Sequence, residues 1–213
     1  AGDVIAGAPP PAAVPAPQAA ARTGRRTNLP GELAALFGRA EEMATLPALL
    51  ASHRLVTILG AGGIGKSRLA QAVAFGTLDR WPDGAWMVEL AGLSDPAQLA
   101  GTVAATLDMK VEAGGSPTDQ LIGFLASRVC LLVLDNCEHL LDAVSDLAAT
   151  LLRSVPGVTL LATSQEPLRV PDEQQFRVVP LAVPADASAS SARGFGAVAL
   201  FEARVRAVDD EEE

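Results

Sequence analysis

The sequence predicts an α/β fold in which a mainly parallel, five-stranded sheet lies between helices on both of its faces. Short apolar runs alternate along the chain with segments that carry apolar residues at helical spacing. These runs are nearly continuous in Val, Ile and Leu, which is typical of strands buried on both faces of a parallel sheet. The chain has 213 residues, 49% of them apolar, so one domain with a substantial core is expected and global disorder is excluded.

Five segments are expected to form the strands. Each is a short apolar run next to turn-forming or charged residues. The third is the most apolar, and it is the longest run that we expect to be buried. The expected strands are residues 54–59, 85–90, 129–134, 158–162 and 176–179.

Helical patterns fill the intervals between these strands. Pro47 falls inside the first helix, where it removes a backbone donor and should kink or split the helix. Ser94 is expected to be the N-cap of a helix that ends near Leu107, and a further helix is expected to begin at Ser116-Pro117. The other expected helices are residues 39–53, 66–78, 138–153 and 197–208, and residues 185–194 are expected to form a loop.

The charge and cysteine content exclude several classes of protein. Sixteen basic and 25 acidic residues give a net charge of −9, and a non-specific nucleic-acid contact needs a basic surface instead. No apolar run is long enough to span a bilayer, and no signal-peptide pattern is present. Cys130 and Cys137 are too few for a disulfide framework and are interpreted as packing residues. We therefore expect a cytoplasmic protein without membrane contact.

The chain is expected to hold one folded domain between two tails. Residues 1–30 contain six of the 15 prolines among many alanines, so they are expected to form a disordered linker. The folded domain is expected over residues 31–208, and residues 209–213 form an acidic tail. A linker at the very start of a chain suggests that the chain is a fragment of a longer protein.

A glycine-rich segment after the first strand carries the clearest chemical signal. Residues 60–67 read Gly-Ala-Gly-Gly-Ile-Gly-Lys-Ser, which fits the phosphate-binding loop pattern and has a strand before it and a helix after it. Glycines let successive N–H groups turn toward phosphate oxygens, and the helix adds its N-terminal donors. Lys66 would bind the β and γ phosphates, and Ser67 would bind Mg²⁺. A plain glycine-rich turn that begins a helix is the alternative interpretation.

Asp135 stands where such a loop needs a second metal ligand. It ends the run Leu131-Leu-Val-Leu-Asp, about 70 residues after the loop, which is typical of a Walker B strand. A carboxylate that emerges from the end of a buried strand could hold Mg²⁺ through water. Asp135 could also cap the helix that follows, and the two roles are partly compatible.

Two further residues are candidates for a role near the γ-phosphate. Glu138 could orient the attacking water, or it could simply lie in the first turn of its helix, where a negative charge is favourable. Thr163 ends the fourth strand, where it could contact the γ-phosphate or cap the strand. These alternatives stay open on the sequence.

Several stretches together resemble the nucleotide-binding module of STAND-class P-loop ATPases. The resemblance is strongest to the NB-ARC-like modules of large bacterial transcriptional regulators. Residues 28–30 with 36–41 resemble the family's G-R-E box, residues 54–67 its P-loop, residues 83–90 its second strand, residues 132–140 its Walker B run and residues 161–168 its sensor-1 run.

The resemblance implies a three-layer P-loop fold with strand order 5-1-4-3-2. It also implies binding of ATP or ADP with Mg²⁺, a DNA-binding domain before the module and sensing domains after it. Two residues depart from the family pattern. Ala40 replaces the Glu of the box, and Gln165 replaces an Arg that reaches the γ-phosphate, so hydrolysis is expected to be weak.

The function that this combination favours is a nucleotide-dependent switch. A non-hydrolysing nucleotide-binding scaffold is the alternative, and a P-loop kinase for a small molecule is a more distant one. The candidate catalytic residues are Lys66, Asp135 and Glu138, and the candidate metal ligands are Ser67 and Asp135. The candidate nucleotide-binding residues are Arg39, Gly60, Ala61, Gly62, Gly63, Ile64, Gly65, Lys66, Ser67, Arg68 and Thr163.

Overall fold

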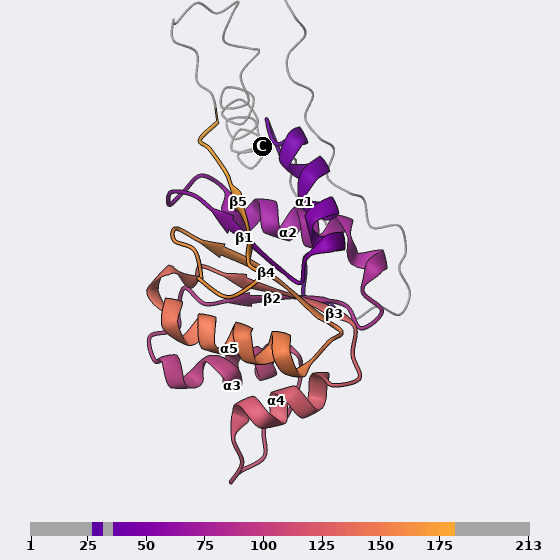
Figure 1. The fold of residues 1–213 in the computed structure, drawn as a ribbon, viewed down its shortest axis with the longest axis vertical. Helices are drawn as coiled ribbons and strands as arrows, with labels where there is room; N and C mark the ends of the chain where they lie inside the picture. The colour runs from indigo at the N-terminus through magenta and orange to yellow at the C-terminus, as the bar shows by residue number, and fades with distance from the viewer. Residues whose placement is uncertain (1–26, 32–35, 182–213) are drawn as a thin grey trace, which may run out of the picture.

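A computed structural model describes residues 27–31 and 36–181 (Figure 1). Its sheet has the order β2-β3-β4-β1-β5, and every neighbouring pair is parallel. This is the predicted order 5-1-4-3-2 read from the other side, so the predicted fold class is confirmed. The strands are β1 (Leu55–Leu59), β2 (Ala85–Glu89), β3 (Cys130–Asp135), β4 (Val158–Ser164) and β5 (Gln174–Arg177).

Helices cover both faces of the sheet and complete three layers. The first layer holds α1 (Ala40–Ser52) and α2 (Lys66–Gly76), and the opposite layer holds α3 (Leu99–Thr106), α4 (Pro117–Leu125) and α5 (Leu141–Ser154) (Figure 1). Short 3₁₀ turns at Leu78–Arg80, Pro96–Gln98 and Cys137–His139 join some of these elements.

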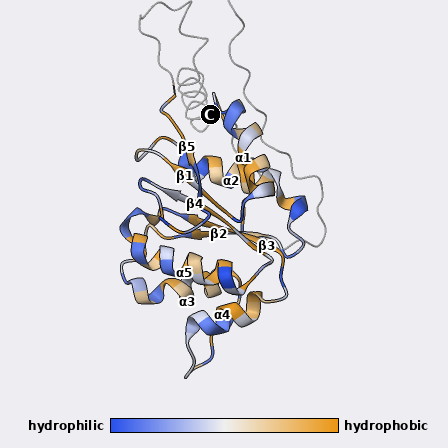
Figure 2. Cartoon of the chain, viewed as in Figure 1, coloured by the Kyte–Doolittle hydropathy of each residue, from blue (hydrophilic) through white to orange (hydrophobic). Residues whose placement is uncertain are grey.

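Strands β1 to β4 divide their buried side chains between two apolar cores, whereas the edge strand β5 is partly exposed. In β3, Leu132 and Leu134 face the core under α3, α4 and α5, whereas Leu131 and Val133 face the core under α1 and α2. Figure 2 shows the matching pattern, with apolar residues along the strands. This two-sided burial explains why the strands read as continuous apolar runs.

A short segment before the main domain packs beside β2. Thr27 forms a parallel bridge with Ala85, and Leu29 is buried in the core under α1 and α2. The side-chain amide of Asn28 bonds both backbone groups of Met87, at 2.7 Å each. These residues fall within the expected linker 1–30, so its last part contacts the domain; residues 1–26 lie outside the described residues.

Several local expectations differ from the structure. The helix α1 continues through Pro47 because Leu46 and Leu50, on either side of it, are both buried and anchor the two halves. The expected cap Ser94 is replaced by Asp95, whose carboxylate accepts from Ala97 N, because Pro96 takes the first position of the turn.

The boundaries of the third strand and the helix after it also shift. Val129 is 43% exposed, and β3 begins one residue later. A 3₁₀ turn precedes α5, which therefore begins at Leu141 instead of residue 138. The expected loop 185–194, the expected helix 197–208 and the acidic tail 209–213 lie outside the described residues.

Candidate nucleotide-binding site

The glycine loop, residues 60–67, begins where β1 ends and joins it to α2. Gly60 N donates to Ser164 O at 3.2 Å, which ties the start of the loop to the end of β4. Gly63 and Gly65 have φ angles of 76° and 92°, a left-handed conformation that glycine adopts without the strain of a side chain. These turns let the chain reverse direction and enter α2 directly at Lys66.

Gly60 is required by close packing. A Cβ there would lie 2.3 Å from Ile64 Cδ1 and 2.9 Å from Val178 O. Farther along the loop the packing is loose: a Cβ on Gly63 or Gly65 would meet no atom within 4 Å. The middle of the loop therefore faces open space at these two glycines.

Lys66 is the cation of this loop, and it is only 8% exposed. Its Nζ donates to Gly60 O and Ala61 O, both at 3.0 Å, and it forms no ion pair with any residue of the described ranges. An ammonium has three N–H donors, so these bonds leave one for another acceptor. A nearly buried positive charge without a counter-ion favours an anionic ligand.

Asp135 and Thr163 meet at the carboxyl ends of β3 and β4. The Thr163 hydroxyl donates to Asp135 Oδ1 at 2.6 Å and accepts from Asn136 N at 2.9 Å. Thr163 is 1% exposed, so this pair of bonds fixes the direction of the carboxylate. Asp135 does not cap α5, because Leu140 occupies the N-cap position there and makes no side-chain cap bond.

Glu138 lies in the 3₁₀ turn before α5 and bonds the end of β4. Its Oε1 accepts from Gln165 Nε2 at 2.9 Å, whereas its Oε2 is buried without a hydrogen-bond partner among the described residues. Gln165 Nε2 also lies 3.9 Å from the position of a Cβ on Gly62. Glu138 and Gln165 therefore lie at the same end of the sheet as the glycine loop.

The structure adds one acidic residue to this end that the sequence did not single out. Glu89 is the last residue of β2, is exposed, and pairs in register with Asp135. Its position at the end of the second strand was the available signal, but only the strand register shows that the two carboxylates are neighbours.

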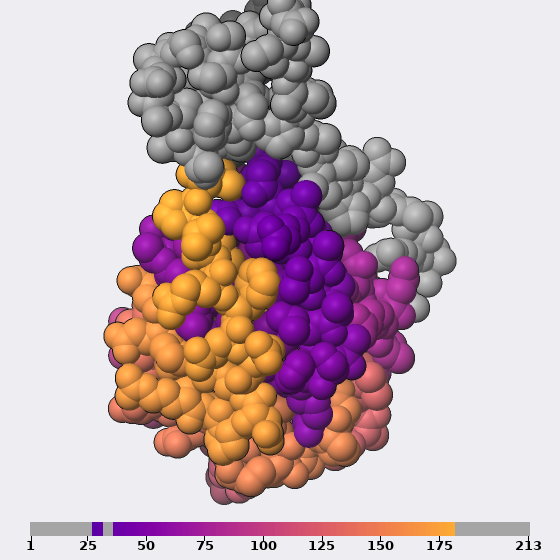
Figure 3. Space-filling view, turned by 45° about the horizontal axis from the view of Figure 1, so that its top comes forward, coloured from indigo at the N-terminus to yellow at the C-terminus, as the bar shows by residue number. Residues whose placement is uncertain are grey.

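Arg39 supports the glycine loop from its carbonyl side. It is 5% exposed, and its guanidinium donates to Ile64 O at 3.0 Å and Val179 O at 2.8 Å. It also forms an ion pair with Glu42 at 2.7 Å, three residues along α1 from Arg39. Figure 3 shows the indigo α1 segment beside the yellow segment that follows β5. The bond from Arg39 to Val179 O joins these two segments. Ser67 and Arg68 lie half-buried in the first turn of α2.

Both cysteines are buried, as expected for packing residues. Burial raises the pKa of the Cys130 thiol to about 12, and burial together with nearby Asp135 raises the pKa of Cys137 even further. Both side chains therefore stay protonated at neutral pH. Within the described ranges, no group of three His, Cys, Asp or Glu residues could hold a metal by itself. Mg²⁺ beside a nucleotide needs fewer protein ligands, and the oxygens of Ser67 and Asp135 are of the type it prefers.

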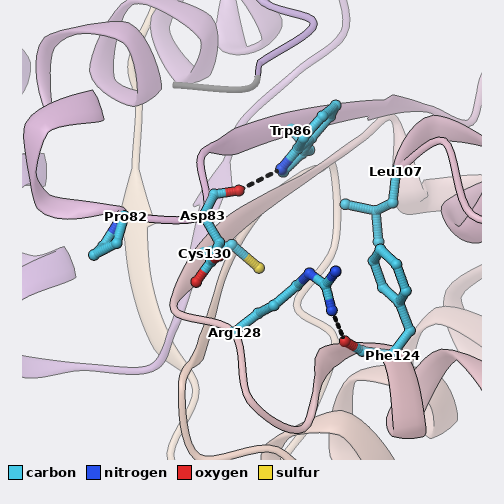
Figure 4. Close-up of a pocket in the computed structure, with 7 residues that line it drawn as sticks. All are labelled: Pro82, Asp83, Trp86, Leu107, Phe124, Arg128 and Cys130. Atoms are coloured by element: carbon cyan, nitrogen blue, oxygen red, sulfur yellow. Dashed lines mark hydrogen bonds between the residues drawn. The ribbon is translucent and has the colours of Figure 1, made fainter. Parts of the chain in front are cut away.

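A cavity of about 390 Å³ lies at the opposite end of the sheet, away from the loop (Figure 4). The Arg128 guanidinium lies 3.6 Å from the centre of the Phe124 ring in its wall. The lining residues are Pro82, Asp83, Trp86, Leu107, Phe124, Arg128 and Cys130. Separately, none of the described helices combines the length and apolar character needed to cross a membrane.

Comparisons with known proteins place this geometry in a family. Residues 30–201 match the family model described as Novel STAND NTPase 1. A Mycobacterium tuberculosis protein that carries the name of an HTH-type transcriptional regulator is 43% identical over 136 residues, which cover 64% of this chain and 15% of that protein. An uncharacterized protein of the same species is 38% identical over 155 residues, which cover 73% of this chain and 39% of that protein. The chain thus spans well under half the length of these relatives.

Solved structures show the same fold at low sequence identity. A STAND protein with a tetratricopeptide repeat sensor from Pyrococcus horikoshii has a TM-score of 0.50 and 17% identity, over 72% of this chain and 24% of that chain. A chain of the Drosophila ORC bound to DNA has a TM-score of 0.53 and 18% identity, over 66% of this chain and 42% of that chain. With a family model that covers most of its residues, the chain belongs to the Novel STAND NTPase 1 family.

Proposed function

We propose that the chain binds ATP or ADP with Mg²⁺ at the glycine loop and serves as the nucleotide-dependent switch of a transcriptional regulator. The observation that carries the proposal is Lys66, a nearly buried cation with no counter-ion in the described ranges and a donor left over. It lies on a loop whose middle is open, at the edge where parallel α/β sheets bind their ligands.

The residues divide the binding task among them. The loop N–H groups and the N-terminus of α2 would surround the phosphates, and Lys66 would contribute its charge. Ser67 and the Thr163-oriented Asp135 would hold Mg²⁺, which when bound neutralises phosphate charge. Arg39 would keep the loop in shape through its bond to the Ile64 carbonyl.

The regulatory part of the proposal is supported by the relatives. One relative carries the name of an HTH-type transcriptional regulator, and this chain covers only 15% of its length. We propose that a DNA-binding domain and sensing domains accompany the module in the whole protein, and that it works in the cytoplasm. The acidic balance of the chain favours nucleic-acid binding by such a partner domain over binding by this module.

The decisive test compares the two lysines of the chain. Lys66→Ala should weaken the binding of a fluorescent ATP analogue by about 100-fold, because the positive charge beside the phosphates and the remaining N–H donor are lost. Lys110→Ala is the matched control, since Lys110 is exposed and outside the site. Equal affinity of the two variants and the unmodified chain would refute nucleotide binding at the loop.

Hydrolysis is proposed to be weak, with Lys66, Asp135 and Glu138 as its residues. A non-hydrolysing scaffold is a second candidate, and one observation favours it: Glu138 has one oxygen bonded to Gln165 and the other buried. Phosphate release from ATP by the full chain separates the two. Slow phosphate release that is lowered further in Glu138→Gln supports a switch that hydrolyses ATP. A rate of phosphate release no higher than that of Lys66→Ala supports the scaffold.

A further inference from the structure

Two residues at the end of β4 each bind one carboxylate beside the loop. Thr163 bonds Asp135, and two residues later Gln165 bonds Glu138. The two bonds differ in their surroundings, because Thr163 is buried and Gln165 is exposed. An exposed side chain gives up a hydrogen bond more readily than a buried one, since water replaces the lost partner. Asp135 is therefore fixed, whereas Glu138 is held by a bond that can be exchanged.

Gln165 also lies against the glycine loop. Its Nε2 is 3.9 Å from the position that a Cβ on Gly62 would take, so a side chain at Gly62 would touch the amide. A glutamine amide carries two N–H donors, and the bond to Glu138 uses one of them. A phosphate oxygen held by the loop would be a charged acceptor that draws the amide nitrogen away from Glu138.

The half-buried Glu138 carboxylate is held in one orientation by these surroundings. Oε1 is bonded to Gln165, and Oε2 is buried without a partner among the described residues. A buried carboxylate oxygen without a donor costs free energy, so this position of Glu138 is maintained by its surroundings. If Gln165 releases Oε1, the carboxylate is free to turn and accept a hydrogen bond from water.

We propose that Gln165 is a positioning residue that holds the Glu138 carboxylate in this orientation until a polyphosphate occupies the glycine loop. The Gln165 amide then moves from Glu138 to a phosphate oxygen, and Glu138 becomes available to water. No covalent bond changes in this step, because one acceptor replaces another on the same N–H donor. The inference rests on the proposed nucleotide binding and adds a device that couples occupancy of the loop to Glu138.

A double-mutant cycle on the full chain tests the exchange. The affinity for a non-hydrolysable ATP analogue is measured by calorimetry for the unmodified chain, Glu138→Ala, Gln165→Met and the double variant. Removing Glu138 frees the Gln165 amide for phosphate, so Glu138→Ala should tighten binding by about threefold to tenfold. When Gln165→Met is already present, Glu138→Ala should tighten binding by less than about twofold, because only the negative charge of Glu138 is then removed.

The outcomes distinguish this inference from the proposed function. If Glu138→Ala changed the affinity by the same factor with and without Gln165→Met, the exchange would be overturned, while Lys66-dependent binding would stand. Absence of Lys66-dependent binding would overturn both. Gln98→Met is the matched control, because Gln98 donates a similar amide bond to Asp95 at 3.2 Å on an exposed turn, and it should leave the affinity unchanged.

A second measurement, by NMR, follows nucleotide binding to the unmodified chain. In the chain with ¹⁵N-labelled glutamine, the Gln165 side-chain amide signal, assigned with Gln165→Met, should shift when the ATP analogue is added. The Gln98 amide signal should stay in place. An unshifted Gln165 signal at saturating analogue would overturn the exchange.

Discussion

The two ends of the sheet are built differently, although the same strands reach both. At the amino ends, backbone groups are bonded by side chains: Arg54 donates to the carbonyls of Leu152, Val155 and Val158, and Asp83 accepts from Val129 N. At the carboxyl ends, the glycine loop is open and Lys66 has no counter-ion in the described ranges. Arg39 and Thr163 also bond backbone groups at the carboxyl ends, so the open loop and the unpaired charge of Lys66 are what distinguish that end.

The difference follows from the energetics of polar groups. A buried polar group that is hydrogen-bonded within the protein stabilises the fold. A buried polar group without a partner lowers the stability, and a ligand that bonds it restores the lost free energy. Substitutions at the amino ends should therefore mainly change the free energy of unfolding. Substitutions at the carboxyl ends should mainly change binding.

The largest difference is expected between two glycines. A Cβ on Gly157 would lie 2.1 Å from Arg128 O, whereas a Cβ on Gly62 would have its nearest neighbour at 3.9 Å. Gly157→Ala should lower the free energy of unfolding by about 3 kcal/mol, because backbone must move. Gly62→Ala should change it by less than about 0.5 kcal/mol and still weaken nucleotide binding. Urea unfolding measures both, and equal destabilisation would contradict the contrast between the ends.

The next effect is expected at Arg54. Arg54→Met keeps the aliphatic stem but leaves carbonyls at the end of α5 unbonded, and should cost about 2 kcal/mol in urea unfolding. Arg153→Met is the control, because Arg153 is exposed and bonds only the Thr150 hydroxyl among the described residues, and it should cost less than about 0.5 kcal/mol. Similar losses for both would mean that Arg54 does not hold the amino end.

Two buried threonines should respond with opposite signs. The Thr57 hydroxyl, in the middle of β1, is buried without a partner among the described residues, so Thr57→Val should stabilise the fold by about 1 kcal/mol. Thr163→Val loses two bonds, should cost about 1 kcal/mol, and should weaken binding of the ATP analogue more with Mg²⁺ than without it. Loss of stability in both variants would show that Thr57 has a role that its contacts do not reveal.

The smallest effect concerns the two cysteines, Cys130 at the start of β3 and Cys137 in the turn after it. Their raised pKa values keep both thiols protonated below pH 9, so labelling requires opening of the fold. At pH 8, Cys137 in its short turn should react about threefold faster than Cys130 in the sheet. The ATP analogue should slow the labelling of Cys137 alone. Mass spectrometry of the labelled chain measures both rates, and faster reaction of Cys130 would reverse the contrast.

The sequence predicts the layers and the glycine loop because both depend on local patterns. Apolar runs locate the strands, and the spacing of Gly60, Lys66 and Ser67 locates the loop. The strand order came from the family resemblance, since no local pattern encodes which strands are neighbours. The N-cap at Asp95 was missed although the following Pro96 is a local signal for it.

The contacts that shape the site depend on tertiary structure and could not be read in advance. The Glu138–Gln165 bond joins residues 27 positions apart, and the pairing of Glu89 with Asp135 follows from strand register. Arg39 was expected to contact nucleotide, and in the structure its guanidinium contacts the backbone of Ile64 and Val179 instead. Its contact with nucleotide stays a prediction.

The Asn28 amide has a consequence for how the protein behaves at high concentration. An outer strand with free peptide groups recruits strands from other molecules and starts intermolecular sheets. Asn28 imitates a peptide unit and occupies both backbone groups of Met87, in the middle of β2. The residues just before the domain thereby protect this border against self-association, and trimming the chain past Leu29 would make it prone to aggregate.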